Sequence, residues 1–254
     1  MNAIELINLR KEFKDVVAVK NINLSVKEGT FFGFLGPNGA GKTVTIKMMV
    51  GLLKPTSGQI DLFGFDVDKD EIEHKRKTGI VLDEPLFFEK LTGKEYLHFV
   101  GRMYDLDKKI AESRTKELLE FFELQDKRNK FIETYSAGMK RKISLAAALI
   151  HNPDLLILDE PFEGIDAVSS KLIRNNLELM VKKGASVFLT SHILEIIEKL
   201  CSEIAIINLG EIIFKSTAEK IRDEVSKEKY SGLEELFLSL VATGREKESL
   251  SWLV

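Results

Sequence analysis

The segment Gly36-Pro37-Asn38-Gly39-Ala40-Gly41-Lys42-Thr43 matches the pattern G-x-x-x-x-G-K-[ST], in which a glycine-rich loop binds phosphate. The apolar run Thr30 to Leu35 comes directly before it and predicts a buried strand, and Val44 to Val50 after it predicts a helix. This order of strand, loop and helix is the setting that the pattern requires. A glycine-rich turn with a solvent-facing lysine is the alternative, and the complete pattern in this setting disfavours it.

The chemistry of a phosphate-binding loop gives each part of this segment a role. Glycines let backbone N–H groups surround an anion closely, and the start of the following helix adds positive potential. Lys42 would neutralise the β- and γ-phosphates of a nucleotide, and the Thr43 hydroxyl would be a ligand of Mg²⁺.

A second acidic motif fits the same chemistry. Asp159 and Glu160 directly follow the apolar run Leu155 to Leu158, which predicts another buried strand. The carboxyl ends of strands in an open parallel sheet face the ligand crevice, so both side chains would emerge beside the phosphates. Asp159 would hold Mg²⁺ through water, and Glu160 would orient or deprotonate the attacking water. A solvated turn is the alternative, and the phosphate-loop pattern makes it the weaker one.

The composition excludes several classes of protein. The chain has 254 residues, 44% of them apolar, and 37 Lys plus Arg against 40 Asp plus Glu give a net charge of −3. Cys201 is the only cysteine, which excludes an intrachain disulfide and a multi-cysteine metal cluster and fits a reducing cytoplasm. The longest apolar run, Leu145 to Ile150, is far shorter than the roughly 18–20 residues of a membrane-spanning helix. The mildly acidic balance argues against nucleic acid as the main partner.

The pattern of apolar residues divides the chain into three regions. Alternating residues at 22–26 and 59–63 predict strands, so the first third is β-rich. From about 84 to 152 the pattern is helical and includes a capping box at Thr92 and Glu95. Beyond it, predicted strands at 155–158, 187–190 and 204–208 alternate with predicted helices at 168–183 and 193–200. Such alternation predicts a parallel sheet covered on both faces. The last forty residues predict charged helices, with a second capping box at Ser231 and Glu234.

The segment Tyr135-Ser136-Ala137-Gly138-Met139 adds a second predicted anion site. Ser136 is a good N-cap for the Ala-rich helix that follows, so its hydroxyl and the free N–H groups of the first turn can bind phosphate. A plain helix cap is the simpler interpretation when the segment is considered alone. Together with the phosphate loop and the Asp-Glu pair, however, these residues resemble the ATP-binding subunits of ABC transporters. The likeness covers about residues 1–214 and keeps the family's motif order.

The resemblance implies a fold and a site. The fold would be α/β, a P-loop NTPase with a central, mainly parallel sheet, an N-terminal antiparallel β subdomain and an inserted all-helical subdomain. Residues 1–214 would form the ATPase domain, with the insertion at about 84–152, and residues 215–254 a helical tail. Residues 135–139 resemble the family's signature, usually Leu-Ser-Gly-Gly-Gln. In that family two chains pack head to tail, and each ATP lies between one chain's phosphate loop and the other chain's signature, here Ser136, Ala137 and Gly138.

Further residues match the family one by one. Phe13 stands where an aromatic ring stacks on adenine, although it could also be a strand core residue. The segment Gly164-Ile165-Asp166 resembles the D-loop, which contacts the opposite site. His192, after the predicted strand 187–190, resembles the switch histidine that touches the γ-phosphate; a lone histidine is more often structural, but its place at a strand's carboxyl end favours the switch role.

Three positions depart from the family pattern. Asp83 stands where a glutamine usually links Mg²⁺ to the membrane partner, and its carboxylate can still bind a metal. Val44 replaces a hydroxyl residue that contacts the α-phosphate, so one hydrogen bond of about 0.5–1.5 kcal/mol is lost. Ala137 replaces a signature glycine, which requires only that the helix start tolerate a methyl group.

The resemblance implies an ATPase that uses ATP and Mg²⁺ and drives transport through separate transmembrane permease subunits. The chain would work as a homodimer, or as a heterodimer with a sister ATPase, in the cytoplasm on the inner face of the cell membrane. Asp83-Glu84-Pro85, residues 135–140 and the tail helix at 233–241 look most like the bacterial ABC-2-type exporter subfamily. The alternatives are a soluble ABC-type ATPase acting on ribosomes or DNA, and a small-molecule kinase, which would leave Ser136 and His192 unexplained.

Overall fold

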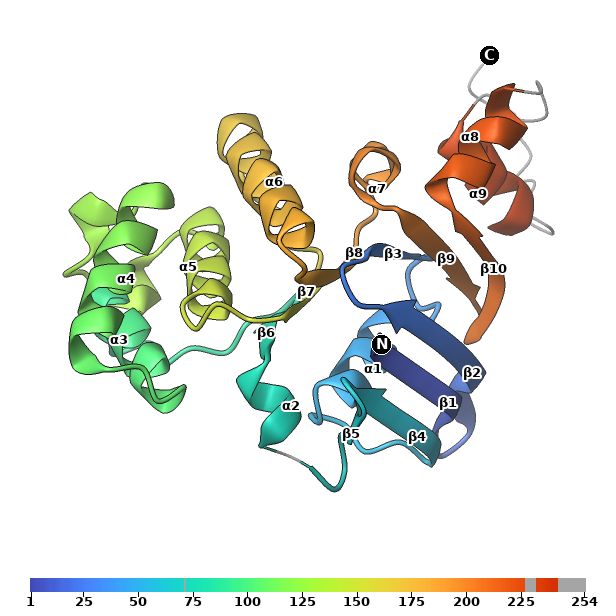
Figure 1. The fold of residues 1–254 in the computed structure, drawn as a ribbon, viewed down its shortest axis with the longest axis horizontal. Helices are drawn as coiled ribbons and strands as arrows, with labels where there is room; N and C mark the ends of the chain where they lie inside the picture. Colours follow the sequence, from blue (N-terminus) through green and yellow to red (C-terminus); the bar gives the residue numbers. More distant parts are fainter. Residues whose placement is uncertain (71, 227–231, 242–254) are drawn as a thin grey trace, which may run out of the picture.

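The computed structural model describes residues 1–70, 72–226 and 232–241. Its larger sheet has six strands in the order β10-β9-β3-β8-β7-β6 (Figure 1). These strands are β3 (Phe31–Leu35), β6 (Thr78–Val81), β7 (Leu155–Asp159), β8 (Ser186–Thr190), β9 (Glu203–Asn208) and β10 (Glu211–Thr217). All neighbours are parallel except β10, which runs antiparallel to β9. The predicted mainly parallel sheet is therefore confirmed.

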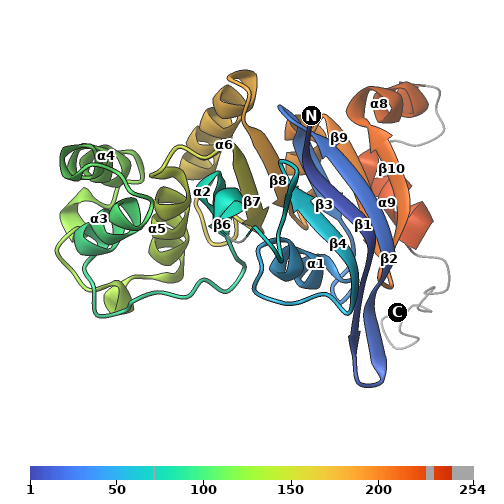
Figure 2. The same cartoon turned by 60° about the horizontal axis from the view of Figure 1, so that its bottom comes forward.

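The second sheet is antiparallel and has the order β2-β1-β4-β5. Its strands are β1 (Asn2–Phe13), β2 (Val16–Lys27), β4 (Ser57–Leu62) and β5 (Phe65–Asp66). The strands predicted at 22–26 and 59–63 are present in β2 and β4, but the sequence analysis missed β1. Figure 2 shows this sheet in front of β3, with β2 beside β10, where the Lys20 N–H donates to the Gly210 carbonyl at 2.7 Å.

The central strands of the larger sheet are buried on both faces. In β3, Phe32 and Phe34 pack into the cluster that contains the antiparallel sheet and α1 (Lys42–Met49). Phe31 and Leu35 point to the opposite cluster, which contains α6 (Ala167–Lys182) and α7 (Leu194–Leu200). A strand buried on both sides needs an unbroken apolar run, which explains the sequence that precedes the phosphate loop.

The segment between β6 and β7 holds α3 (Gly93–Met103), α4 (Lys108–Phe121), the short 3₁₀ turns Gln125–Lys127 and Ile132–Thr134, and α5 (Ala137–Leu149). A short helix, α2 (Glu73–Arg76), precedes β6. The capping box at the start of α3 is confirmed, because the Thr92 hydroxyl accepts from the Glu95 N–H at 3.2 Å and the Glu95 carboxylate accepts from the Thr92 N–H at 2.9 Å. Figure 1 shows α3, α4 and α5 grouped on one side of the sheet.

The C-terminal part begins inside the sheet, because β10 crosses the boundary expected at 214/215. It continues as α8 (Ala218–Ser226) and α9 (Leu233–Val241). Leu233 and Leu236 of α9 are buried in the cluster that contains α7. The capping box predicted at Ser231 lies outside the described residues. No helix among the described residues is long and apolar enough to cross a membrane.

Candidate functional site

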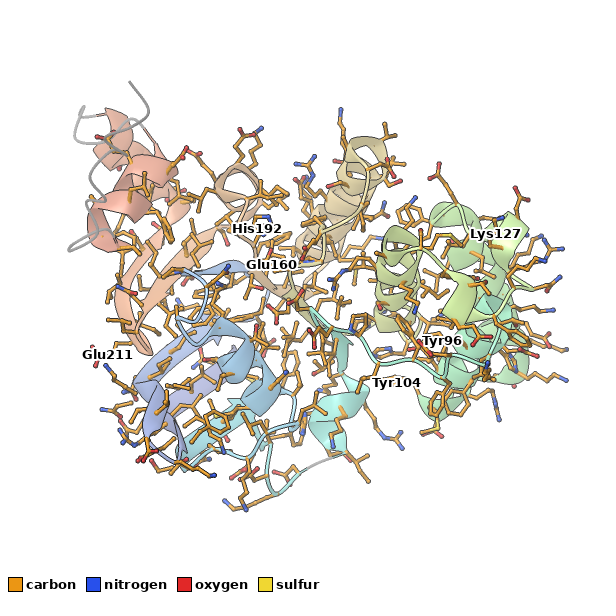
Figure 3. The ribbon with its side chains drawn as sticks, turned by 180° about the vertical axis from the view of Figure 1, so that it is seen from behind. Tyr96, Tyr104, Lys127, Glu160, His192 and Glu211 are labelled. Atoms are coloured by element: carbon orange, nitrogen blue, oxygen red, sulfur yellow. The ribbon has the colours of Figure 1, made fainter. Side chains whose placement is uncertain are left out.

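Most of the residues predicted for the phosphate site lie at one edge of the larger sheet, where the carboxyl ends of its parallel strands meet. The phosphate loop follows β3, His192 follows β8, Asp159 ends β7, and Asp83 follows β6. These four strands are consecutive neighbours in the sheet, so their carboxyl ends open onto the same place. Figure 3 shows Glu160 and His192 side by side at this edge.

The loop depends on glycine at defined positions. Gly41 has a φ of +112° and Gly39 a φ of +79°, a region that residues with a Cβ rarely adopt. A Cβ on Gly36 would lie 2.3 Å from the Ile207 carbonyl oxygen. Gly41 is the N-cap of α1 and supplies no side-chain cap, so the first N–H groups of the helix remain available to an anion.

Lys42 is folded back over the loop. Its Nζ donates to the carbonyls of Gly36 at 2.7 Å and Pro37 at 3.2 Å, and the residue is only 9% exposed. Burial lowers the pKa of the ammonium. The negative charges that oppose this shift belong to Glu160, Asp159 and Asp83. A buried cation held by neutral carbonyls and facing carboxylates is suited to exchange those carbonyls for phosphate oxygens.

A buried threonine organises the acidic pair. The Thr190 hydroxyl donates to Asp159 Oδ1 at 2.5 Å and accepts the Glu160 N–H at 3.1 Å. Asp159 and Thr190 are register partners on β7 and β8, and both are fully buried. Thr190 therefore fixes the direction of the Asp159 carboxylate and the turn into Glu160, whose φ is +48°.

Glu160 and His192 are in direct hydrogen-bond contact. Glu160 Oε2 accepts the backbone N–H of His192 at 3.1 Å and lies 2.9 Å from His192 Nδ1. The Glu160 side chain is largely buried, whereas the His192 ring is mostly exposed. These contacts hold the Glu160 carboxylate in one position beside the end of β7, as a general base at this place would require.

The oxygen atoms at this edge fit Mg²⁺. Asp159 Oδ2 is buried and has no hydrogen-bond partner among the described residues. Thr43 is half-buried in the first turn of α1. No cluster of three His, Cys, Asp or Glu that could hold a metal alone occurs in the described part of the chain. One carboxylate and one hydroxyl match the way Mg²⁺ binds in nucleotide sites, where phosphates and waters supply most ligands.

Asp83 and Phe13 occupy less buried positions. The Asp83 side chain is 44% exposed, and its Oδ1 lies 3.4 Å from the Arg141 guanidinium. Phe13 is also 44% exposed at the end of β1, with Lys11 Nζ 5.0 Å from its ring centre. Phe13 is thus not a strand core residue, and its stacking on adenine remains a prediction.

The signature-like segment lies apart from the phosphate loop. Ser136 is the N-cap of α5, and its hydroxyl accepts the Met139 N–H at 3.3 Å. Ser136 and Ala137 are exposed, so the alanine methyl group meets solvent. A Cβ on Gly138 would lie 2.5 Å from the Gly164 carbonyl oxygen, so the segment touches the predicted D-loop of its own chain. Figures 1 and 2 both place α5 with α3 and α4 and to one side of α1.

Two residues of the site were missed from the sequence. Thr190 is the polar last residue of a buried apolar strand and lies two residues before His192. A polar side chain at the carboxyl end of such a strand is a sequence signal that could have identified Thr190 as a site residue. Arg141 lies in the run Lys140-Arg141-Lys142, which by itself indicates only a solvated helix face. The contacts of Arg141 depend on how α5 packs against the end of β6.

Comparison with known proteins agrees with this geometry. The family model described as "ABC transporter" matches residues 19–163. The chain belongs to the ABC transporter family. As a member of this family it is an ATP-binding subunit with ATPase activity.

Several ABC transporter proteins resemble the chain over most of its length. The linearmycin resistance ATP-binding protein of Bacillus subtilis is 41% identical over 91% of this chain and 76% of its own length. The ABC transporter ATP-binding protein NatA of the same organism is 32% identical over 95% of this chain and 99% of its own length. The bacitracin transport ATP-binding protein of Bacillus licheniformis is 39% identical over 83% and 68%.

Solved ABC transporter structures share the fold. An ATP-binding subunit of an ABC transporter superposes with a TM-score of 0.87 at 29% identity and covers 94% of this chain and 99% of its own. A bacterial ABC transporter cassette, described as dimeric, superposes with a TM-score of 0.78 at 25% identity, over 85% and 98%.

Proposed function

We propose that two copies of this ATPase, or one copy and a sister chain, enclose each ATP with Mg²⁺ between the phosphate loop of one chain and Ser136 of the other. The observation that carries the proposal is the unequal state of the two anion sites. The phosphate loop has a buried cation and an acidic pair beside it, whereas Ser136 is exposed at a helix start that its own hydroxyl caps. An exposed half-site of this kind is completed by another surface.

Each chain's own residues would divide the chemistry of hydrolysis. Mg²⁺, when bound, supplies charge neutralisation for the phosphates; Thr43 and Asp159 would hold it. Lys42 would leave its loop carbonyls for the β- and γ-phosphates, and residues 36–44 would contact the nucleotide through their backbone. Glu160 would accept the proton of the attacking water, with His192 holding its carboxylate in place and touching the γ-phosphate. Catalysis is mainly positioning and charge stabilisation.

The membrane partner would dock beside Asp83. A pocket of about 300 Å³ opens between the end of β6, α3 and α5, and its walls are mostly apolar. They include Leu52, Leu82, Leu86, Tyr96, Val100 and Tyr104. Leu86 is 89% exposed and Leu52 is 61% exposed, which is a large apolar surface to leave in water. A helix from a permease subunit would cover it and place this chain on the inner face of the cell membrane.

The names of two relatives suggest a direction of transport. Of the three compared, one is named for linearmycin resistance, which export of the compound would explain, and one for bacitracin transport. By analogy, we propose that this chain powers a bacterial ABC-2-type exporter. The compound that it moves would be selected by the permease subunits.

Sedimentation of the Glu160→Gln variant tests the shared site. Glutamine keeps the shape of the side chain but cannot act as a base, so Mg-ATP should stay bound and hold two chains together, because a ligand that binds only the dimer favours the dimer. Adding Ser136→Arg should abolish this association. Asp107→Arg is the matched control, since Asp107 is the N-cap of α4 and its loss removes a cap without touching the proposed site.

Each outcome of this experiment either supports or refutes the shared site. ATP-dependent dimers in Glu160→Gln and in Glu160→Gln/Asp107→Arg, but not in Glu160→Gln/Ser136→Arg, support the proposal. If Glu160→Gln stays monomeric with saturating Mg-ATP, the run is repeated with the candidate sister chain, and dimers in that mixture identify a heterodimer. Monomers in both runs refute the shared site.

A further inference from the structure

Arg141 joins α5 to the segment that follows β6. Its guanidinium donates to the Leu82 carbonyl at 2.6 Å and to the Asp83 carbonyl at 2.8 Å. The same group lies 3.4 Å from the Asp83 carboxylate. A planar guanidinium can hold two neighbouring carbonyls at once, which a single ammonium group cannot do with the same geometry.

Arg141 is buried, so its hydrogen bonds are needed to compensate for the removal of its charge from water. Its side chain is only 8% exposed, and a buried guanidinium needs acceptors and a counter-charge. The two carbonyls and the Asp83 carboxylate supply both. The neighbouring Lys140 also reaches this segment, through Glu89 at 3.2 Å, but that pair is exposed and such pairs contribute little.

The arginine lies near one end of a helix that is anchored at the other end as well. It is five positions beyond Ser136, the N-cap of α5. Toward the C-terminal end of α5, a Cβ on Gly79 of β6 would lie 2.2 Å from the Ala148 carbonyl oxygen. The backbones of α5 and β6 therefore touch there, and Arg141 provides the second attachment, close to Ser136.

Asp83 also lies within the electrostatic reach of Lys42. Its charge is one of the three that oppose the lowering of the Lys42 pKa. The segment held by Arg141 therefore lies at the same end of the sheet as the chain's own phosphate loop, whereas the other end of the same attachment is α5, whose N-cap is Ser136.

We propose that Arg141 is a positioning residue that makes Asp83 and the start of α5 move as one body. When Ser136 docks on the nucleotide held by the partner's phosphate loop, α5 moves with it. Through Arg141 this movement positions Asp83 relative to the nucleotide held by the chain's own phosphate loop. This inference rests on the proposed shared site. Arg141 touches no nucleotide in this scheme and acts through the Leu82 and Asp83 carbonyls.

Hydrogen exchange measured by mass spectrometry tests the attachment directly. The full chain carries Glu160→Gln, so that ATP holds the dimer, and exchange is followed in peptides covering residues 83–91 and 36–43 with and without Mg-ATP. Arg141→Met removes the guanidinium and keeps an apolar stem. Arg141→Lys keeps the charge. Arg114→Met is the matched control, because Arg114 donates to the Ile150 carbonyl, just beyond the other end of α5, at 2.7 Å.

The proposal predicts that ATP-dependent protection from hydrogen exchange responds differently in the two peptides. In Arg141→Met, the ATP-dependent protection of 83–91 is lost while that of 36–43 persists, and the Kd for ATP changes less than twofold. Without the Glu160→Gln change, kcat falls at least tenfold and KM stays within twofold. Arg141→Lys is intermediate, and Arg114→Met behaves like the parent. A variant that merely loses stability would lower protection in both peptides and in the thermal melt.

Two results would overturn the inference. Unchanged ATP-dependent protection of 83–91 in Arg141→Met shows that Arg141 does not set this segment. Loss of protection in Arg114→Met to the same extent shows a general loosening of α5. If the Glu160→Gln parent itself gains no ATP-dependent protection or dimer, the shared site fails, and the role of Arg141 fails with it; this outcome is recognised before any Arg141 variant is compared.

Discussion

Two helices of this protein begin with N–H groups that can bind an anion, but they are built in opposite ways. α1 starts at Gly41 without a side-chain cap, and Lys42 beside it is buried near three carboxylates. α5 starts at Ser136, whose own hydroxyl caps the Met139 N–H. The nearest cation in that turn, Lys140, is already paired with Glu89.

The difference indicates that the two helix starts have different roles in binding phosphate. The α1 site has a fixed cation, an acidic pair and a buried carboxylate oxygen that no described residue hydrogen-bonds, so it is suited to bind and process a phosphate group. The α5 start offers only N–H groups, a hydroxyl and a dipole, which suffice to recognise a phosphate that is already held elsewhere. Under the proposed function, a complete site uses both kinds of surface.

Replacing Lys42 should cause the largest loss. Lys42→Ala removes the only side-chain cation that the loop directs at the phosphates, and removal of one such group lowers turnover by about 100- to 1,000-fold. Thermal unfolding should change little, because losing two carbonyl bonds is offset by no longer burying the ammonium. Steady-state ATPase assays and melting curves check both points. Normal turnover in a natively folded variant would contradict the assignment of the loop.

Mixing two inactive variants should restore activity if the two helix starts serve opposite chains. Lys42→Ala and Ser136→Arg each spoil both sites of a homodimer, but their heterodimer contains one intact site. A one-to-one mixture should then recover up to about a quarter of the wild-type ATPase rate, since half of the dimers are mixed and each has one intact site of two.

The control for this mixture combines both changes in one chain. Lys42→Ala mixed with the double variant Lys42→Ala/Ser136→Arg has no intact phosphate loop and should stay inactive. Recovery in the control would mean that the activity does not come from the assigned site. Absence of recovery in the first mixture would count against pairing Lys42 of one chain with Ser136 of the other.

Thr190→Val should give an intermediate effect. Valine has the same shape but cannot hydrogen-bond Asp159 Oδ1 or accept the Glu160 N–H. Leaving two buried groups unpaired should lower the free energy of unfolding by about 1–3 kcal/mol. The misplaced carboxylates should lower kcat by roughly 10- to 100-fold.

A second buried threonine separates stability from catalysis. Thr78 is equally buried, and its hydroxyl donates to the His74 carbonyl at 2.7 Å, in the segment that leads from α2 into β6. Thr78→Val should lose comparable stability in chemical denaturation and keep its kcat. Equal losses of kcat in the two variants would show that Thr190 acts only through the stability of the sheet.

The sequence analysis found most of the fold because local signals and tertiary environment agree. Buried parallel strands such as β3 and β7 need unbroken apolar runs, and such runs can be recognised in the amino-acid sequence alone. β1 was missed although Ala3, Ile4, Leu6 and Leu9 of this strand are buried, because their spacing changes where register shifts interrupt its pairing with β2. An alternating pattern does not reveal a strand across such interruptions.

The site was predictable where a motif places chemistry at the end of a strand. Lys42, Asp159 and His192 follow β3, end β7 and follow β8, and the parallel sheet brings these ends together. Contacts that depend on packing between distant segments left no such signal. Arg141 and the Leu82 carbonyl are separated by 59 positions, and the arginine sits between two lysines that suggest a solvent-exposed face.

Asp83→Ala should have the smallest effect on the isolated chain. The lost ion pair with Arg141 is partly exposed and contributes about 1 kcal/mol at most to the free energy of unfolding, so the isolated chain should keep most of its ATPase activity. The Leu82 and Asp83 carbonyls keep their bonds to Arg141, because alanine preserves the backbone. In the complex with the permease, where Asp83 would transmit the docking of the partner, the loss of ATPase stimulation should be larger. Parallel ATPase assays on the isolated chain and on the complex in lipid vesicles measure the two effects. Asp83→Gln, which restores the residue usual at this position in the family, should retain the stimulation. Equal losses in both assays would make Asp83 part of the hydrolytic site alone, and no loss in either would remove its coupling role.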